Sequence, residues 1–275
     1  MNDTEVSGKA RKVAHVNEDI CRGCGTCVAN CPSGAASLHE LKTDVGPVII
    51  EKAGVYEEYD DIFDAVHSNA LSAVKVFLDR GIDANIQDET GATPLHWATH
   101  NDLPEIVELL VDHGAAINAH DCDGWTPLHW TKSKRIFDYF MSKGADLNSR
   151  DQCGQTPLHL LAMTERPDAV EYLISKGAQV NAREAFGKTP LHFAALKGNT
   201  KVADMLLSKG AEVNARDESG KTPLHFAVIK EHKDVAKLLL DRGADRAITD
   251  KDRKTAIDYA REKGFKSLVE MLGKK

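Results

Sequence analysis

A four-residue motif, Thr-Pro-Leu-His, recurs through most of this 275-residue chain. Its five copies end at His96, His129, His159, His192 and His225. The histidines are separated by 129−96 = 33, 159−129 = 30, 192−159 = 33 and 225−192 = 33 residues. A fixed period in this range is the signature of a stacked array of repeats. The chain is therefore predicted to fold as a solenoid, in which each repeat contacts only its neighbours.

The stretch Lys188–Ala215 represents the repeat unit and predicts a pair of short helices. Thr189 is suited to cap the first helix, and Pro190 suits its first position, where its missing N–H would be unpaired anyway. The second helix carries apolar residues at i, i+3 and i+4, and Gly210 supplies the positive φ that ends it. These apolar residues are Val202, Met205 and Leu206. One such pair cannot bury its apolar face alone, so each unit is stable only against its neighbours.

The Thr-Pro-Leu-His motif, the 33-residue period and the recurring Gly-Ala pair resemble the ankyrin repeat over roughly residues 57–272. The resemblance implies a mainly α solenoid, with β-hairpin fingers perpendicular to the helices. The first unit lacks the motif, and Asp258 replaces the histidine in the last unit, as expected of capping units. We expect about seven units, in an ankyrin-repeat domain over residues 57–275.

A separate segment over residues 1–56 is expected to precede the repeats. Val48–Glu51 is predicted to be a short strand in this segment. The acidic stretch Tyr56–Asp61 is predicted to mark the boundary between this segment and the repeat helices.

The repeat that contains His129 is three residues short. The separation 136−129 = 7 residues from His129 to Ile136 compares with 202−192 = 10 from His192 to Val202. Three residues are nearly one helical turn, so we expect a shortened first helix and a notch in the array. Two aromatic residues of this repeat occupy its apolar stripe and are predicted to be buried: Phe137 and Phe140.

Composition and charge argue against several classes of protein. The formal net charge of −7 disfavours a general nucleic-acid binder, which usually shows a basic surplus. No run of about 18 apolar residues is present, so no membrane span is expected, and the N-terminus lacks the apolar core of a secretory signal. We expect a cytoplasmic protein, whose six cysteines are reduced or bound to metal. Cys122 and Cys153, near adjacent fingertips, are expected to be free thiols, because a disulfide needs Cα atoms within about 7 Å.

Four of the cysteines lie within eleven residues and are followed at once by Pro32. They are Cys21, Cys24, Cys27 and Cys31, with the spacing C-x2-C-x2-C-x3-C-P. This run resembles the cluster-binding sequence of bacterial ferredoxins, and the stretch around it is similar to the ferredoxin modules of heterodisulfide-reductase-like subunits. The resemblance implies a small α+β, half-ferredoxin-like N-terminal segment that binds a 4Fe-4S cluster.

The match to two-cluster ferredoxins is incomplete, because only one cysteine run is present. In those proteins the fourth cysteine of a run ligates the second cluster, and here the next cysteine after Cys31 is Cys122, 122−31 = 91 residues further on. Three arrangements remain open: all four cysteines wrap one cluster, another ligand replaces Cys31, or two chains exchange Cys31 in a two-cluster homodimer. A structural zinc site is the alternative, although zinc sites usually pair C-x2-C with a distant second pair.

The motif histidines are not expected to bind metal. Stacked helices lie about 8–10 Å apart, whereas zinc–nitrogen bonds need about 2 Å. In ankyrin repeats this histidine hydrogen-bonds the motif threonine and neighbouring backbone, and we expect the same role here. Trp97 and Trp130 follow the histidine directly and are predicted to pack, as large apolar residues usually do.

Partner binding is expected on the concave face that the ankyrin resemblance implies. Trp125 stands directly before a Thr-Pro-Leu-His motif, at a position that resembles the recognition face, and later repeats carry Lys188 and Lys221 there. Phe186, two residues before Lys188, is a further candidate contact. An exposed Trp125 would be a binding anchor, but it could equally pack over the shortened repeat.

No nucleophile–base constellation, phosphate loop or flavin fingerprint is present, so the chain is not expected to be an enzyme. The leading hypothesis is an electron-transfer adaptor, in which the repeat array docks a small 4Fe-4S module onto a protein partner. One alternative is an interaction scaffold whose cysteine segment is purely structural. The other is a redox or oxygen sensor whose cluster controls partner binding.

Overall fold

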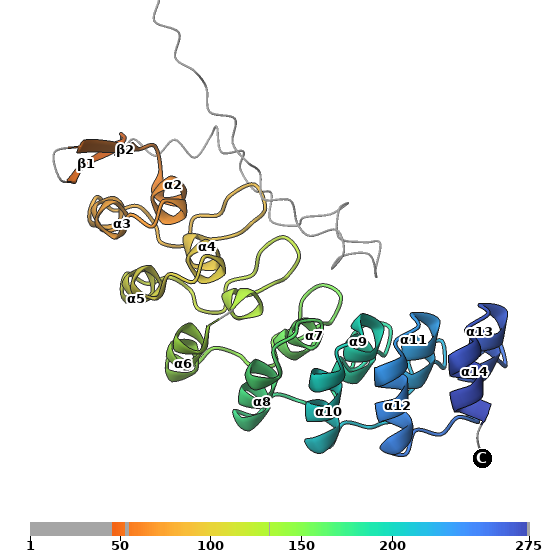
Figure 1. Ribbon diagram of the computed structural model, residues 1–275. Helices are drawn as coiled ribbons and strands as arrows, with labels where there is room; N and C mark the ends of the chain where they lie inside the picture. The colour runs from red at the N-terminus through yellow and green to blue at the C-terminus, as the bar shows by residue number, and fades with distance from the viewer. Residues whose placement is uncertain (1–45, 53–54, 132, 274–275) are drawn as a thin grey trace, which may run out of the picture.

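The computed structural model describes residues 46–52, 55–131 and 133–273, so the four-cysteine run lies outside the described residues. Within these ranges the chain forms one two-stranded sheet, thirteen α-helices and one 3-10 helix, η1. The helices pair into seven units, numbered here in chain order, that follow one another along an arc (Figure 1). The fold is mainly helical, as the sequence predicts.

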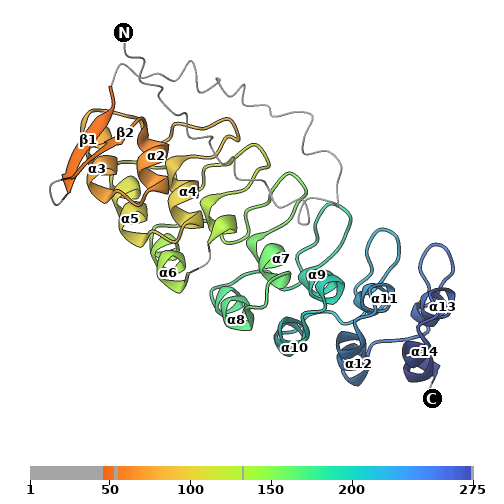
Figure 2. The same cartoon turned by 45° about the horizontal axis from the view of Figure 1, so that its top comes forward.

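The first helix of each unit lies on the inner side of the arc and the second helix on the outer side (Figures 1 and 2). The first helices are α2 (Ile62–His67), α4 (Pro94–His100), η1 (Pro127–Trp130), α7 (Pro157–Ala162), α9 (Pro190–Lys197), α11 (Pro223–Ile229) and α13 (Ala256–Glu262). The second helices are α3 (Leu71–Asp79), α5 (Pro104–Asp112), α6 (Lys134–Ser142), α8 (Pro167–Ser175), α10 (Thr200–Ser208), α12 (Lys233–Asp241) and α14 (Lys266–Gly273).

In units 2 to 6, hydrogen bonds between the motif threonine and the motif histidine form the start of the first helix. In unit 5, the backbone N–H of Thr189 donates to Nδ1 of His192 at 3.0 Å, and the Thr189 hydroxyl lies 2.9 Å from the same nitrogen. Because Nδ1 accepts, the ring proton sits on Nε2, which donates to the carbonyl oxygen of Lys221 in unit 6 at 3.1 Å. The motif thus starts a helix and joins two units, and the predicted role of the histidines is confirmed.

Asparagines in the loops after the second helices provide further links between units. The side chain of Asn181 accepts from the backbone N–H of Glu212 at 2.9 Å and donates to the carbonyl of Gly210 at 3.0 Å. The same backbone bond recurs for Asn85, Asn118, Asn148 and Asn214. Beneath these links, buried apolar side chains form one core that extends from Val48 to Leu272. Each unit is therefore held by its neighbours, as a solenoid requires.

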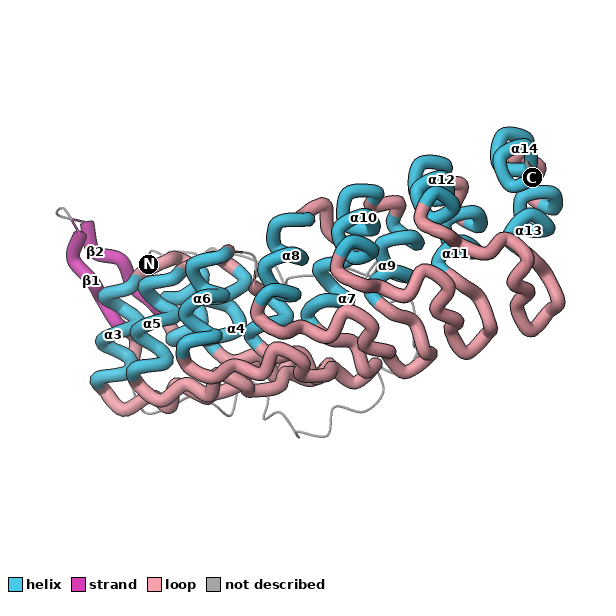
Figure 3. Tube along the Cα trace, turned by 90° about the horizontal axis from the view of Figure 1, so that it is seen from below, coloured by secondary structure: helices cyan, strands magenta, loops and turns pink. Residues whose placement is uncertain are grey.

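The fingers are loops that project along one edge of the array (Figure 3). Before α9, the backbone N–H of Glu184 donates to the carbonyl of Lys188 at 3.0 Å, and Gly187 turns the chain with φ of 76°. A backbone bond from Glu218 to the carbonyl of Phe186, at 2.8 Å, joins this finger to the next. One such bond between two fingers makes no ladder, so the described fingers are hairpin-shaped turns and contain no β-strand.

The short repeat is unit 3, whose first helix is the four-residue helix η1. Thr131 leaves the helical path directly after Trp130, with an extended ψ of 127°. Ser133 then caps α6 by accepting a hydrogen bond from the backbone of Ile136 at 3.4 Å. The prediction of a shortened helix is confirmed, and both aromatic residues predicted to be core are buried: Phe137 and Phe140.

A β-hairpin covers the N-terminal end of the array. Strand β1 (Val48–Lys52) pairs antiparallel with β2 (Val55–Tyr59), and Val48 lies opposite Tyr59. Both of these side chains are buried, and β1 contacts α3. The predicted strand is confirmed by β1. Strand β2 is not predicted, because its acidic residues indicate a boundary between the two parts of the chain.

Candidate protein-binding face and metal centre

A row of large side chains follows the first helices of units 2 to 7. It consists of the residue after each motif histidine and, in unit 7, its counterpart: Trp97, Trp130, Leu160, Phe193, Phe226 and Tyr259. All six are partly buried. Four rings pack edge-on against the histidine of the preceding unit, with centroid distances of 5.6 Å (His96–Trp130), 5.4 Å (His159–Phe193), 5.7 Å (His192–Phe226) and 6.1 Å (His225–Tyr259). The buried histidines therefore also position this row, which we call the aromatic row.

The three tryptophans of the chain form one cluster in units 2 and 3. The ring of Trp130 lies between the other two, 5.2 Å from Trp97 and 6.4 Å from Trp125, and nearly perpendicular to both. The indole N–H of Trp97 donates to Asp88 at 2.6 Å, and that of Trp125 donates to Asp151 at 2.9 Å. Trp97 and Trp130 pack as predicted. Trp125 is half-buried, and its indole N–H is bonded to the next finger, so it is not a free side chain.

Burial raises the pKa values of two aspartates near Trp125. Burial raises the pKa of Asp151 to about 6, although its carboxylate accepts hydrogen bonds from the backbone of Gln155 and the indole of Trp125. Burial also raises the pKa of Asp121 to about 7, against the effect of bonds from the backbone of Trp125 and Asp123. The charge on this part of the face consequently changes near neutral pH.

Three lysines occupy the position before the motif in units 5 and 6 and the equivalent position in unit 7: Lys188, Lys221 and Lys254. Lys188 lies over the ring of Phe186, with Nζ 5.1 Å from its centroid and 4.0 Å from a carboxylate oxygen of Glu184. Lys221 pairs with Asp250 at 3.1 Å. Burial opposes the ionisation of Asp250, but hydrogen bonds from the Tyr259 hydroxyl, the backbone of Lys254 and Lys221 outweigh it and hold its pKa below the usual range.

The structure brings only some of the predicted contact residues together. Phe186 and Lys188 touch, and Lys221 follows one unit later, whereas Trp125 belongs to unit 3 and is separated from them by the finger of unit 4. Sequence reasoning missed Lys254, whose Nζ lies 2.7 Å from Glu262. The signal was available, since 254−221 = 33 residues repeats the period into the capping unit.

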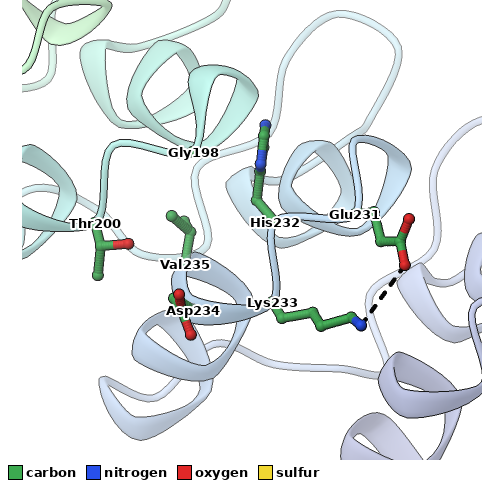
Figure 4. Close-up of a pocket in the computed structure, with 7 residues that line it drawn as sticks. All are labelled: Gly198, Thr200, Glu231, His232, Lys233, Asp234 and Val235. Carbon is green, nitrogen blue, oxygen red and sulfur yellow. Dashed lines mark ion pairs between the residues drawn. The ribbon is translucent and has the colours of Figure 1, made fainter.

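A hollow of about 330 Å³ lies at the turns of units 5 and 6 (Figure 4). Its lining comes from Gly198, Thr200, Glu231, His232, Lys233, Asp234 and Val235. Nε2 of His232 bonds the carbonyl of Leu196 at 3.1 Å, and Glu231 pairs with Lys233 at 3.7 Å. His232, Glu231 and Lys233 are thus engaged with one another or with the backbone.

The proposed cluster ligands Cys21, Cys24, Cys27 and Cys31 all lie outside the described residues. Within residues 46–52, 55–131 and 133–273, histidine, cysteine and acidic side chains form no group of three that could hold a metal ion. The motif histidines are not available as ligands, because both ring nitrogens of His96, His129, His159 and His192 are already hydrogen-bonded to protein.

The expectation that Cys122 and Cys153 are free thiols is wrong, since both are disulfide-bonded in the structure. Adjacent fingers lie within backbone hydrogen-bonding distance of each other, because the backbone N–H of Cys122 donates to the carbonyl of Thr90 at 2.9 Å and that of Gln152 donates to the carbonyl of Asp123 at 3.0 Å. The assumption that the fingers are as widely spaced as stacked helices is therefore wrong.

The fold and the aromatic row define a helical repeat solenoid with a continuous inner face. A family model described as ankyrin repeats in three copies matches residues 62–151 and 131–217, and one described as ankyrin repeats in many copies matches residues 197–240. These matches cover more than half of the chain, which therefore belongs to the ankyrin repeat family.

The N-terminal segment has a separate relationship. A family model for a 4Fe-4S binding domain matches residues 13–36, which include the four-cysteine run. The chain is also similar to a probable ferredoxin from Methanosarcina thermophila, with 57% identity over 28 residues. That match covers 10% of this chain and 48% of the ferredoxin, so it spans about half the length of that relative. The chain thus combines ankyrin repeats with an N-terminal 4Fe-4S binding domain.

Proposed function

We propose that this protein is an iron–sulfur electron-transfer adaptor, in which the ankyrin repeats dock a ferredoxin-like 4Fe-4S module onto a protein partner. The observation that carries the proposal is the presence of a four-cysteine run, within a 4Fe-4S binding domain, on the same chain as a repeat solenoid. The partial match to a probable ferredoxin supports one-electron transfer as the role of the module.

The donor set fits a 4Fe-4S cluster. Four cysteines provide four thiolates, and their close spacing in a single run matches ferredoxin ligation better than the two separated pairs of a zinc site. Cys21, Cys24 and Cys27 are the core ligands in this proposal, with Cys31 as the fourth. A bound cluster supplies a site that gains and loses a single electron. The protein's own part is to supply thiolates and to hold them in place.

The inner face of the arc is the proposed docking surface. Trp125, Phe186, Lys188 and Lys221 are its proposed contacts. Phe186 is 37% exposed, and the lysines place ammonium groups beside aromatic rings. Since each of these lysines already faces a carboxylate, the face is mixed in charge. It therefore favours a partner surface with both apolar and paired charged groups over a purely acidic one.

A substitution pair within the cysteine run tests the proposal. Cys24→Ala removes a thiolate, whereas Thr26→Ala changes a residue of the same run that has no thiol. We expect the reconstituted wild-type protein and Thr26→Ala to show a reversible one-electron couple by voltammetry, and Cys24→Ala to lose it. A protein that holds iron without any reversible couple would instead indicate a structural centre.

The exchange of Cys31 between two chains is a further arrangement that follows from the single run. It predicts a dimer that holds two 4Fe-4S clusters, with about eight irons in total. It also predicts that the Cys31→Ala variant is monomeric and contains little iron. A monomer that carries four irons per chain would contradict it.

Two further properties belong to the same proposal. The chain acts as a carrier and not as an enzyme in its own right, and it works in the cytoplasm. In the described part of the chain, no helix combines the length and the apolar character needed to cross a membrane.

A further inference from the structure

The exposed large hydrophobic side chains of the described residues are unevenly distributed. Four are exposed: Ile49 at 59%, Tyr56 at 71%, Leu71 at 43% and Phe186 at 37%. Three of them belong to the N-terminal hairpin or to unit 1, whereas none lies in the described part of units 6 and 7. Terminal repeats usually present a polar outer face. The C-terminal end of the array follows that rule and the N-terminal end does not.

The register of the hairpin explains why Ile49 and Tyr56 are exposed. Val48 opposes Tyr59 on the buried face, which lies against unit 1. Successive side chains of a strand alternate between faces, so Ile49, Glu51, Tyr56 and Glu58 share the other face. Ile49 opposes Glu58, and Tyr56 opposes Glu51. We call this set the outer hairpin face, and it holds two large apolar side chains among carboxylates.

The chain itself provides a neighbour for this face. Residues 1–45 lead directly into the hairpin, and the carbonyl of Gly46 accepts a hydrogen bond from Arg80 at 3.2 Å, which fixes the point of attachment. Cys31 is 46−31 = 15 residues before Gly46, a stretch that can span at most about 50 Å. A segment of 45 residues buries too little apolar surface to be stable alone. A tether this short also gives an effective concentration of order millimolar.

Residues 1–45 carry six acidic and five basic side chains, so any charge complementarity with the hairpin is local. The carboxylates of the outer hairpin face are Glu51 and Glu58. The N-terminal segment has three cations within four residues: Lys9, Arg11 and Lys12. Opposite charges on facing surfaces favour the correct encounter and disfavour wrong partners.

We propose that the outer hairpin face is the docking surface for the iron–sulfur segment of the same chain, residues 1–45, which packs over Ile49 and Tyr56. Docking places the cluster-binding domain at the N-terminal end of the arc and holds it against the array, which leaves the inner face available for a partner. The proposal depends on the 4Fe-4S binding domain but not on electron transfer by it.

Three full-length proteins test the docking: wild type, the double variant Ile49→Ser/Tyr56→Ser, and Phe186→Ser. The last is a matched control, because it removes an exposed large apolar side chain from unit 5. Each protein is reconstituted without air, and two rates are measured: iron loss to a chelator, and trypsin cleavage within residues 1–45. Far-UV circular dichroism shows whether the repeats of each variant remain folded.

We expect the double variant to lose iron and to be cleaved about tenfold faster than wild type, as the loss of an apolar contact would produce. Phe186→Ser should match wild type within about twofold. Equal rates in all three proteins would overturn the proposal. So would wild-type rates that depend on protein concentration, because the face would then join two copies of the chain. A protein without redox activity would contradict the electron-transfer proposal, but iron loss and trypsin cleavage would still test the docking.

Discussion

Each motif histidine is buried in a site that accepts only the neutral ring. In unit 5, Nδ1 of His192 accepts from Thr189, and its Nε2–H donates to Lys221 of the next unit. Burial lowers the pKa of His96, His129, His159 and His192 to about 4, and it also lowers that of His225. Protonation would remove the acceptor at Nδ1, so it would loosen both the helix start and the contact between units.

Because of these lowered pKa values, we expect the free energy of unfolding to fall as the pH falls from about 6.5 to about 4. In that range the histidines of the unfolded chain bind protons, whereas those of the folded chain do not. Asp121 and Asp151 act in the opposite direction, because their raised pKa values let the folded chain bind protons first. Five histidines outweigh two aspartates, and we expect the free energy of unfolding to drop by on the order of 5 kcal/mol between pH 7.5 and 5. Urea unfolding at each pH, monitored by the helical circular-dichroism signal, measures this free energy.

A comparison of wild type with His192→Asn makes this test specific. The variant should flatten the dependence of stability on pH, because it removes one of the buried rings whose lowered pKa causes that dependence. A wild-type protein equally stable at both pH values would contradict the buried, neutral state of the motif histidines.

The lysines of the face differ in how much the fold depends on them. Lys221 and Asp250 form a pair whose side chains are 19% and 0% exposed. Lys221→Met leaves a buried carboxylate without its ammonium partner, and we expect a loss of about 2–3 kcal/mol in unfolding free energy. The equivalent Lys254→Met breaks a pair that is 38% and 51% exposed and should cost less than about 1 kcal/mol. Equal losses in urea unfolding would show that burial does not distinguish the two pairs.

At the scale of elements, unit 3 has the shortest first helix of the described array, and we expect it to open most easily among the internal units. Its first helix is one turn of 3-10 helix, whereas α9 and α11 have eight and seven residues. A short 3-10 helix has few internal hydrogen bonds of poor geometry. Compensation comes from side chains, because Trp130 packs between the other two tryptophans.

Hydrogen exchange should reveal this weakness. Backbone amides of residues 127–131 are expected to exchange at least about tenfold faster than those of residues 190–194, because local opening costs less where fewer bonds must break. Both peptides come from one digest, so α9 serves as an internal control. Equal protection would mean that the tryptophan cluster fully replaces the missing turn.

The elements that the sequence predicts well are those with a local cause. The Thr-Pro-Leu-His motif places each helix start, and the three missing residues of unit 3 predict its short helix. The elements it misses depend on distant contacts. Strand β2 contains Glu57 and Glu58, which by themselves indicate a boundary and not a strand. Its pairing depends on Tyr59, which is buried opposite Val48.

The same distinction applies to the candidate sites. The cysteine run is recognisable from spacing alone, and the family model matches the same stretch. The orientation of Trp125 is set by Asp151, 26 residues away in the next finger, which no local pattern indicates. The 33-residue period also places Lys254 at this position, but the last unit lacks the Thr-Pro-Leu-His motif that marks it elsewhere.

At the scale of the whole molecule, two modules with different requirements share one chain. The solenoid is stabilised by a core that extends through every unit. The N-terminal segment is too short for such a core, so its folding should depend on cluster binding and on the outer hairpin face. This dependence links the fold of the segment to its proposed role as an electron carrier.

The most direct test of the central claim is the iron and acid-labile sulfide content of the full-length protein purified without air, combined with EPR spectroscopy. We predict about four irons and four sulfides per chain for a 4Fe-4S domain, with an EPR signal that appears on one-electron reduction and disappears on reoxidation. Protein that is colourless, or that carries zinc in place of iron, would contradict the claim that the cysteine run binds an electron-carrying cluster.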